Sequence, residues 1–283
     1  MRIVSYANRT FRDAQIVQSM RALELGFQHV LQFSELDLSH DFRKKNAGTL
    51  SMSRGAGYWI WKPSIILQYT QSLKTDFQVL YLDSGSLPRK SALEFQNLLV
   101  DDRIHVWEIG NQDIKTWTDK KVLDSLGVGE RSRNSPMIWA GALCARNSKT
   151  LEVFLKTWET LCSNPEYLHP ETLPSYKKDD LVIWHRHDQS LLSILVAENP
   201  EWFCVHQNSD KKDNWTSFFD RHKKSKISYV LLVQTFPKLR NLRRNIIVRL
   251  PKIIRVILRD FRDRFNGKNL SNAESKSLRK NFY

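Results

Sequence analysis

The feature that most constrains the fold is an apolar run, Phe77–Leu82, that stops abruptly at Asp83-Ser84-Gly85. A glycine-punctuated aromatic loop and then apolar residues at helical spacing come before it, in residues 54–73. A buried strand with such an ending carries a carboxylate to the edge of a sheet, and open α/β sheets bind their ligands at the carboxyl ends of the strands. Asp83 is therefore expected to meet a metal ion or a substrate hydroxyl; the alternative is an acid that only caps a turn before Pro88.

The first part of the chain predicts how this sheet is built. Residues 3–7 have the pattern of a strand, 13–25 that of a helix ended by Gly26, and 29–33 that of a second strand. Strand, helix and strand at this spacing predict a parallel pair with a right-handed crossover. Later patterns predict helices at 92–99, 115–126 and 150–162, and strands at 104–108, 137–145 and 203–206. We expect an α/β sandwich around a mostly parallel sheet.

The positive charge is concentrated at one end. Of the 44 Lys/Arg and 30 Asp/Glu, residues 221–283 hold 18 basic and 3 acidic, whereas the remainder holds 26 basic and 27 acidic. We therefore predict a neutral domain over residues 1–220 and a basic tail over 221–283. At 283 residues the chain is long enough for a full core beside that tail.

Within the tail, residues 243–265 read as a basic amphipathic helix. Apolar residues recur at helical spacing between the arginines, and Pro251 suits a first helical position. Such a helix lies in the interface of an anionic membrane. The alternatives are a nucleic-acid surface or a helix packed on the domain. The continuous Ile/Leu/Phe face favours the membrane over nucleic acid.

Three scattered cysteines and an N-terminus without an apolar core predict the compartment. Cys144, Cys162 and Cys204 have no C-x-x-C spacing, which favours buried free thiols in a reducing environment. No signal peptide is evident, and no window approaches the roughly 18 apolar residues of a membrane span. The expected location is cytoplasmic, at the inner face of the membrane if the tail binds there.

Two further segments carry chemistry. His185-Arg186-His187-Asp188-Gln189 places two imidazoles, a guanidinium and a carboxylate at the start of an apolar helix, which suits a metal or a diphosphate. The simpler reading is that Asp188 caps the helix. In the loop Arg54–Pro63, Gly55 and Gly57 allow backbone N–H groups to approach an anion, although the order is not that of a P-loop. Its aromatic residues fit either a stacking wall or the core, and Lys62 either a phosphate or solvent.

Four motifs in this order resemble a group of bacterial sugar transferases: GxGYWIWKP, VLYLDSG, IWAGALCARNS and WHRHDQSLLS. The group serves cell-surface polysaccharide synthesis, and its members are similar to retaining galactosyltransferases and α-mannosyltransferases. The resemblance spans residues 1–206. It implies a GT-A-type fold that binds a nucleotide-diphospho-sugar, usually with Mn²⁺ or Mg²⁺.

The resemblance also implies roles for individual residues. The matches to catalytic positions are Asp83, Asp188 and Gln189. The matches to donor-binding positions are Ser5, Tyr6, Ala7, Arg54, Tyr58, Trp61, Lys62, Asp83, Ser84, Gly85, Ala140, Gly141 and Arg186. In the group a strand-end Asp-x-Asp binds the metal, and here Gly85 replaces its second aspartate. A metal would therefore keep Asp83 and need a further ligand, His187 or Asp188.

The predicted function is transfer of a sugar to a growing surface glycan, such as capsule, O-antigen or lipopolysaccharide. The alternative is a non-catalytic binding protein whose basic tail engages membrane or nucleic acid. No Ser-His-Asp order, H-E-x-x-H or G-x-G-x-x-G occurs, so hydrolase and dinucleotide-binding functions have no support in the sequence.

Overall fold

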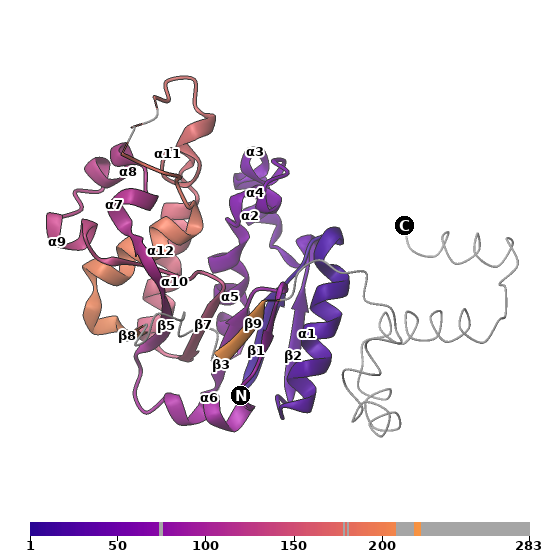
Figure 1. The fold of residues 1–283 in the computed structure, drawn as a ribbon. Coiled ribbons are helices and arrows are strands. Elements are labelled where there is room, and N and C mark those ends of the chain that lie inside the picture. Colours follow the sequence, from indigo (N-terminus) through magenta and orange to yellow (C-terminus); the bar gives the residue numbers. More distant parts are fainter. Residues whose placement is uncertain (74–75, 178, 180, 208–217, 222–283) are drawn as a thin grey trace, which may run out of the picture. The chain divides into compact units, whose positions relative to one another are not determined.

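A computed structural model describes residues 1–73, 76–177, 179, 181–207 and 218–221. These residues form a central sheet with helices on both of its faces (Figure 1). The sheet has seven strands in the order β2-β1-β3-β7-β5-β6, with β8 paired to β5. Their bounds are β1 Arg2–Tyr6, β2 His29–Phe33, β3 Gln78–Leu82, β5 Ile104–Asp113, β6 Pro136–Ile138, β7 Ala142–Arg146 and β8 Phe203–His206.

Five of the seven strands of this sheet run in the same direction: β1, β2, β3, β5 and β8. Strand β1 pairs in parallel with both β2 and β3, and β5 pairs in parallel with β8. Strand β7 joins the two sides by antiparallel pairing with β3 and β5, and β6 is also antiparallel to β5. The predicted α/β sandwich with a mostly parallel sheet is confirmed, including the β1-α1-β2 unit. Because β7 is antiparallel to both β3 and β5, those two strands run in the same direction, and β8 runs with them.

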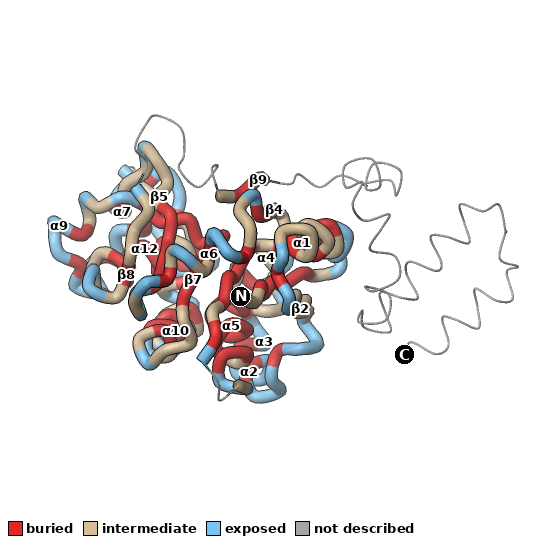
Figure 2. The backbone as a smooth tube through the Cα atoms, turned by 90° about the horizontal axis from the view of Figure 1, so that it is seen from below, coloured by how far each residue is buried: buried red, intermediate tan, exposed pale blue. Residues whose placement is uncertain are grey.

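Each face of the sheet has its own core. Helices α5 (Trp61–Gln71), α10 (Lys149–Cys162) and α12 (Asp188–Glu198) pack on the face that carries Val79 and Tyr81. Helices α1 (Arg12–Glu24) and α6 (Ala92–Leu98) cover the opposite face, which carries Leu80 and Leu82. Strand alternation produces this division, because successive side chains point to opposite faces. Figure 2 shows that α5 and the first part of β5 are almost entirely buried.

Short elements connect these layers. They are η1 Arg9–Phe11, η2 Glu35–Asp37, α2 His40–Lys45, α3 Ala47–Leu50, α4 Gly55–Tyr58, α7 Ile114–Trp117, α8 Lys120–Ser125, α9 Glu130–Arg133, α11 Pro165–Leu168, η3 Pro170–Thr172 and η4 Pro200–Trp202. A separate pair is formed by β4 (Ser86–Pro88) and β9 (Phe219–Arg221), which are antiparallel.

Two predicted elements are each divided in two. The predicted helix 115–126 is α7 followed by α8, because Asp119 starts a new helix by accepting the Lys121 backbone N–H. The predicted strand 137–145 is β6 and β7, interrupted at residues 139–141. There the Ala140 carbonyl accepts a hydrogen bond from Lys62 Nζ, and a Cβ on Gly141 would lie 2.3 Å from the Trp139 indole. The Trp139 indole therefore approaches Gly141 closely, and only a residue without a Cβ fits there.

The predicted tail lies outside the described residues, apart from residue 221. The prediction of an amphipathic helix at 243–265 remains a prediction, as does the domain boundary at residue 220. Strand β9 ends at Arg221 and pairs with β4, so residues 219–221 take part in the fold. Among the described helices, none has the length and hydropathy needed to cross a membrane. The three cysteines are free; Cys144 and Cys162 are buried and Cys204 is half-buried.

Candidate functional site

Asp83 lies immediately after β3, held by its neighbours on three sides. Its backbone N–H donates to the Gly141 carbonyl at 2.8 Å, and its own carbonyl accepts from Gln18 Nε2 at 2.7 Å. The Tyr81 hydroxyl donates to Asp83 Oδ1 at 2.6 Å. The Ser86 N–H closes a turn on the Asp83 carbonyl, so the expected turn is present, whereas the contact of Asp83 with a metal ion or a substrate hydroxyl remains a prediction. The backbone makes a turn, while the carboxylate faces a buried charge.

That charge is Lys62, which lies between two carboxylates. Its Nζ is 2.7 Å from Asp188 Oδ2, 3.4 Å from Asp83 Oδ1 and 3.0 Å from the Ala140 carbonyl oxygen. Lys62 is 2% exposed and Asp188 3% exposed, whereas the Asp83 side chain retains 32% of its exposure. An ammonium group has three N–H donors, and three protein acceptors surround this one. Asp83 is the member of the cluster that solvent reaches.

The protonation of this cluster follows from its burial. Burial raises the pKa of Asp188 to about 6, although Lys62 acts in the opposite direction. Burial alone would lower the pKa of Lys62, but the Asp188 and Asp83 carboxylates outweigh it and the pKa is raised. Lys62 therefore keeps its positive charge between the two carboxyl groups. Such a charged group at the carboxyl ends of strands is costly to bury, and clusters of this kind gather at functional sites.

Lys62 owes its place to a strained loop. Trp61 begins α5 four residues earlier than the apolar spacing at Ile65 indicates, so Lys62 lies in the first helical turn. The preceding residues Ala56, Tyr58 and Trp59 have positive φ angles of 51°, 54° and 61°. A Cβ on Gly57 would lie 2.9 Å from the Leu50 backbone, so the loop packs closely on α3. Backbone strain of this kind costs on the order of 1–3 kcal/mol per residue and clusters at functional sites.

His187 is strained as well and stands just before α12. Its φ is 55°, and its side chain does not cap the helix that begins at Asp188. The Asp188 carbonyl instead accepts the Trp158 indole N–H at 3.1 Å, which fixes the start of α12 against α10. The simpler reading, in which Asp188 only caps the helix, is therefore insufficient, because the Asp188 carboxylate pairs with Lys62.

The two imidazoles of the His185–Gln189 segment have different surroundings. His185 Nε2 donates to the Tyr167 carbonyl and its Nδ1 accepts the Asp119 N–H, so both nitrogens are satisfied in the neutral ring. His187 Nδ1 donates to the Leu168 carbonyl at 2.9 Å, but its buried Nε2 has no hydrogen-bond partner. Burial lowers the pKa of His185 to about 4 and that of His187 to about 3. His185 is structural, and His187 keeps one free acceptor.

Further buried polar atoms near His187 also lack hydrogen-bond partners. They are Glu171 Oε2 and Gln189 Nε2. Burial raises the pKa of Glu171, whose Oε1 lies 3.7 Å from His187 Nδ1. Buried polar groups are normally hydrogen-bonded to protein, ligand or ordered water, so these donors and acceptors beside Asp188 mark a place for water or a polar ligand.

Aromatic rings pack around this polar group. Tyr58 contacts the rings of His169 and His187, with centroids 4.9 Å and 4.6 Å away, and Trp59 lies 6.0 Å from the His187 ring. Thr49 Oγ1 lies 3.1 Å from His169 Nε2, which ties α3 to the segment after α11. The aromatic loop is therefore part of the site and of the core at once.

The structure brings together five of the predicted residues: Lys62, Asp83, Ala140, Gly141 and Asp188. Ser84, which follows Asp83, is buried, and Gly85 belongs to the turn after Asp83.

The other predicted donor-binding residues have separate contacts. Ser5 Oγ accepts a hydrogen bond from Gln15, and the Ala7 N–H donates one to the Phe33 carbonyl. The Tyr6 ring stacks on Trp61 with centroids 3.8 Å apart. The guanidinium of Arg54 lies 4.8 Å from the Trp184 ring centroid, and that of Arg186 lies 4.1 Å from the Trp117 ring centroid. Their role in binding a donor remains a prediction.

Sequence reasoning missed Tyr81, Glu171 and His169. Tyr81 carried a usable signal, because residues two apart on a strand share a face and Tyr81 precedes Asp83 by two. Glu171 and His169 lie in the proline-rich connection before α12 and carried no comparable signal.

The predicted metal ligands are Asp83 and His187. Among the described residues, neither belongs to a group of three side chains able to hold an ion. A divalent cation between Asp83 and Asp188 does not fit, because Lys62 Nζ already lies there. A cation bound on the solvent side of Asp83 remains a prediction.

Comparisons with known proteins find likeness in structure only. No protein-family pattern matches the chain, and no curated protein matches its sequence. Similar solved structures include mouse xyloside xylosyltransferase 1 (TM-score 0.43, 11% identity, 72% of this chain and 84% of that one). They also include the galactosyltransferase LgtC in complex with donor and acceptor sugar analogues (TM-score 0.39, 16% identity, 72% of this chain and 73% of that one). A third is a glycosyltransferase involved in the glycosylation of the major capsid of PBCV-1 (TM-score 0.40, 13% identity, 73% of this chain and 82% of that one). At these scores and identities the likenesses are too distant to assign an activity to this chain.

Proposed function

We propose that this chain is a glycosyltransferase that moves a sugar from a nucleotide-diphospho-sugar to a growing cell-surface glycan, such as capsule, O-antigen or lipopolysaccharide. The observation that carries the proposal is the ammonium group of Lys62 held between Asp83 and Asp188 at the end of β3. Three separate segments of the chain meet there, and each comes from a motif of the sugar-transferase resemblance.

In the proposed sugar transfer the protein would supply positive charge and would not need a covalent nucleophile. When the sugar leaves, negative charge grows on the diphosphate, and preorganised cations and N–H groups stabilise it. In this proposal Lys62 supplies that positive charge, and a phosphate contact would require it to release one of its three present acceptors. The acceptor hydroxyl must be positioned against the sugar and lose its proton as the new bond forms.

The two carboxylates would have different roles. Asp83 is partly exposed, so it would contact the donor directly, through the ribose, the diphosphate or a divalent cation on its outer side. Asp188 is buried behind Lys62, so it would keep the lysine charged and in position, close to the transferred sugar. Gln189, whose Nε2 is free, follows it at the start of α12.

The cationic and aromatic residues around this cluster would bind the rest of the donor. Arg54 is exposed beside the strained loop, and Arg186 lies just before His187. Both guanidinium groups suit a diphosphate, since they can form bidentate pairs with phosphate oxygens.

Thermal unfolding of the full chain tests the donor proposal. A panel of nucleotide-sugars and nucleoside diphosphates is added with and without Mn²⁺, and a ligand that binds only the folded state raises Tm by mass action. One nucleotide-sugar is expected to raise Tm, and its dependence on Mn²⁺ would report the cation. No shift with any donor would overturn the proposal.

Variants then connect the binding to the site. Asp83→Ala and Asp188→Ala are expected to abolish sugar transfer while the domain stays folded. Asp102→Ala is the matched control, because Asp102 is exposed and precedes β5, at the end of the sheet opposite to Asp83. Full turnover in both site variants would refute these roles.

The tail would place the enzyme at the inner face of the cell membrane, where lipid-linked acceptors lie. Residues 243–265 combine an apolar face with arginines, which suits an anionic lipid surface. Full-length protein is expected to sediment with anionic vesicles, and deletion of residues 240–283 to prevent this while turnover on a small soluble acceptor persists. Loss of that turnover would instead support the non-catalytic binding protein.

A further inference from the structure

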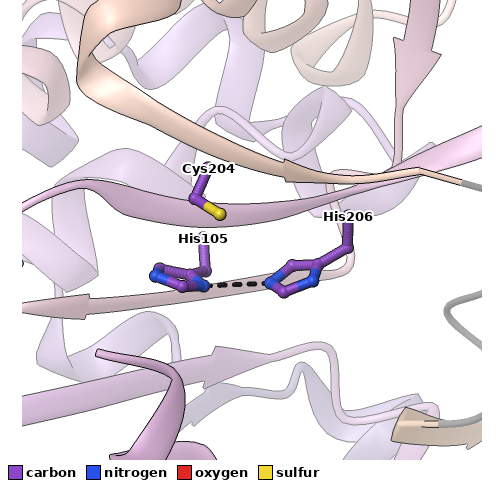
Figure 3. A group of neighbouring side chains, drawn as sticks. All are labelled: His105, Cys204 and His206. Atoms are coloured by element: carbon purple, nitrogen blue, oxygen red, sulfur yellow. Dashed lines mark hydrogen bonds between the residues drawn. The ribbon is translucent and has the colours of Figure 1, made fainter. Parts of the chain in front are cut away.

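A second group of polar side chains lies on the opposite face of the sheet, on β5 and β8. These strands are parallel, and His105 is the register partner of Cys204. His206 follows Cys204 by two residues, so alternation puts its side chain on the same face. Three residues that are remote or unremarkable in sequence, His105, Cys204 and His206, are thereby collected at one place (Figure 3).

Their ligand atoms converge. His105 Nδ1 lies 2.9 Å from His206 Nε2, and all three potential ligand atoms, including Cys204 Sγ, lie within 4.8 Å of one another. In tetrahedral zinc sites, bond lengths of about 2.0–2.3 Å place neighbouring ligand atoms roughly 3.3–3.6 Å apart. Small side-chain rotations would therefore be enough to admit an ion, without movement of either strand.

The surroundings orient the imidazoles. His105 is 4% exposed, and the centroid of its ring lies 5.1 Å from that of the His206 ring. The His206 ring stacks on Trp107 with centroids 5.0 Å apart, which fixes its plane. Neutral imidazole is the form that ligates a metal, and His206 and Cys204 are only half-buried, so an ion can reach them.

We propose that His105, Cys204 and His206 form a zinc-binding site. One thiolate and two imidazoles would supply three ligands, and the fourth position would be open to water. Such a donor set is typical of zinc, whereas Mg²⁺ and Mn²⁺ prefer the oxygen ligands found near Asp83.

The site would be independent of the proposed sugar-transfer site. His105 and its register neighbour Cys144 belong to the face covered by α1 and α6, whereas Lys62 lies on the face covered by α5. Strand β8 pairs only with β5 among the described strands, so it lies at an edge. A zinc ion held by both strands would fasten that edge, and its expected effect is on stability.

The simpler alternative is a histidine pair that needs no ion. In the neutral state one imidazole N–H can donate to the other ring, as the 2.9 Å distance allows. Cys204 would then be an ordinary half-buried thiol. The two arrangements differ in one measurable respect, because only the zinc site uses the sulfur.

The experiment uses the full chain, stripped of metal with a chelator. Zn²⁺ is titrated in competition with a chromophoric chelator, and Co²⁺ is used as a spectroscopic probe. Wild type is expected to bind a single equivalent of Zn²⁺ and to give the thiolate-to-cobalt charge-transfer band. It is also expected to unfold at a higher temperature with Zn²⁺ than without, since the ion binds the folded state.

Two variants and one control decide the outcome. Cys204→Ser is expected to abolish the cobalt band and weaken zinc binding by roughly tenfold or more, and His206→Gln to weaken it similarly. Cys162→Ser removes a buried thiol in α10 and is expected to change neither. Far-ultraviolet circular dichroism without metal checks that each variant is folded, and having two separate ligand variants keeps the test informative if one is not. No zinc binding to wild type, or unchanged binding in both ligand variants, would overturn the proposal and leave the histidine pair.

Discussion

The two faces of the sheet bury polar groups in different ways. On the face covered by α5, a lysine lies between two aspartates, and Asp83 is the member of this cluster that solvent reaches. On the face covered by α1 and α6, two imidazoles of lowered pKa lie against each other beside a thiol. The first cluster contains its own cation, whereas the second can be completed by one. The positive charge of Lys62 suits an anionic donor, and the lone pairs of the two neutral imidazoles suit a metal ion.

Lys62→Met should have the largest effect, because it removes the cation and leaves two carboxylates facing each other. Breaking a buried ion pair costs about 3–5 kcal/mol of unfolding free energy, and chemical denaturation at pH 7 measures it. Sugar transfer is expected to fall on the order of 100-fold or more, since a preorganised charge is lost. The loss of stability should be smaller at pH 5, where Asp188 can take up a proton.

The double variant Lys62→Met/Asp188→Leu separates the two effects. An apolar pair in place of a buried ion pair is often neutral in stability, so stability should largely return while turnover does not. A Lys62→Met protein as stable as wild type would contradict the ion pair at this site.

Acid should destabilise the protein through the buried histidines. The pKa of His185 is lowered to about 4 and that of His187 to about 3, from an ordinary 6.5, chiefly by burial. Below pH 6.5 the unfolded chain binds these protons and the folded chain does not, so stability present above pH 6.5 is lost as pH falls. Each histidine contributes about 1.4 kcal/mol per pH unit. Asp188, with its pKa raised to about 6, acts in the opposite direction below that pH.

Denaturation series between pH 7 and pH 4.5 should therefore show a net loss of about 3 kcal/mol from these three groups. His187→Asn keeps a residue that tolerates the positive φ and should reduce the slope, whereas the exposed His40→Gln should leave it unchanged. A flat profile would show that the histidines are charged in the folded state.

Gly141→Ala tests whether the two faces are coupled. The new Cβ would lie 2.3 Å from the Trp139 indole, which packs in the α1 and α6 core, while the Gly141 carbonyl holds the Asp83 N–H. Displacing a buried ring costs about 1–3 kcal/mol, and donor binding should weaken as Asp83 moves. Gly48→Ala is the control, since nothing lies within 4 Å of its Cβ. Lost stability with unchanged donor binding would show that the faces are separate.

Cys204→Ser should have the smallest effect on the sugar-transfer site. Its side chain faces away from Lys62, so the donor-induced change in Tm should equal that of wild type, with or without a chelator. A donor-induced shift that disappears in this variant would mean that the proposed zinc site supports transfer.

Local sequence signals determined most of the framework. Short apolar runs and helical spacing located β1, α1, β2, β3 and α10 almost to the residue, helped by clear terminators such as Gly26 and Asp83. The same signals marked Lys62, Asp83 and Asp188 as residues of interest. They did not show that these three contact one another, since the chain separates them by up to 126 residues.

Only the tertiary structure decided which polar residues meet. Lys62 reaches both carboxylates because the strained loop starts α5 early, and loop strain is maintained by packing that no local pattern reveals. His105 meets Cys204 because β5 and β8 pair in one register, and a shift by one residue would turn every side chain to the other face. Hydrophobic periodicity and helix caps depend on residues that are close along the chain, so they can be inferred from the sequence. Register and burial are properties of distant segments, and they assembled both clusters of this protein.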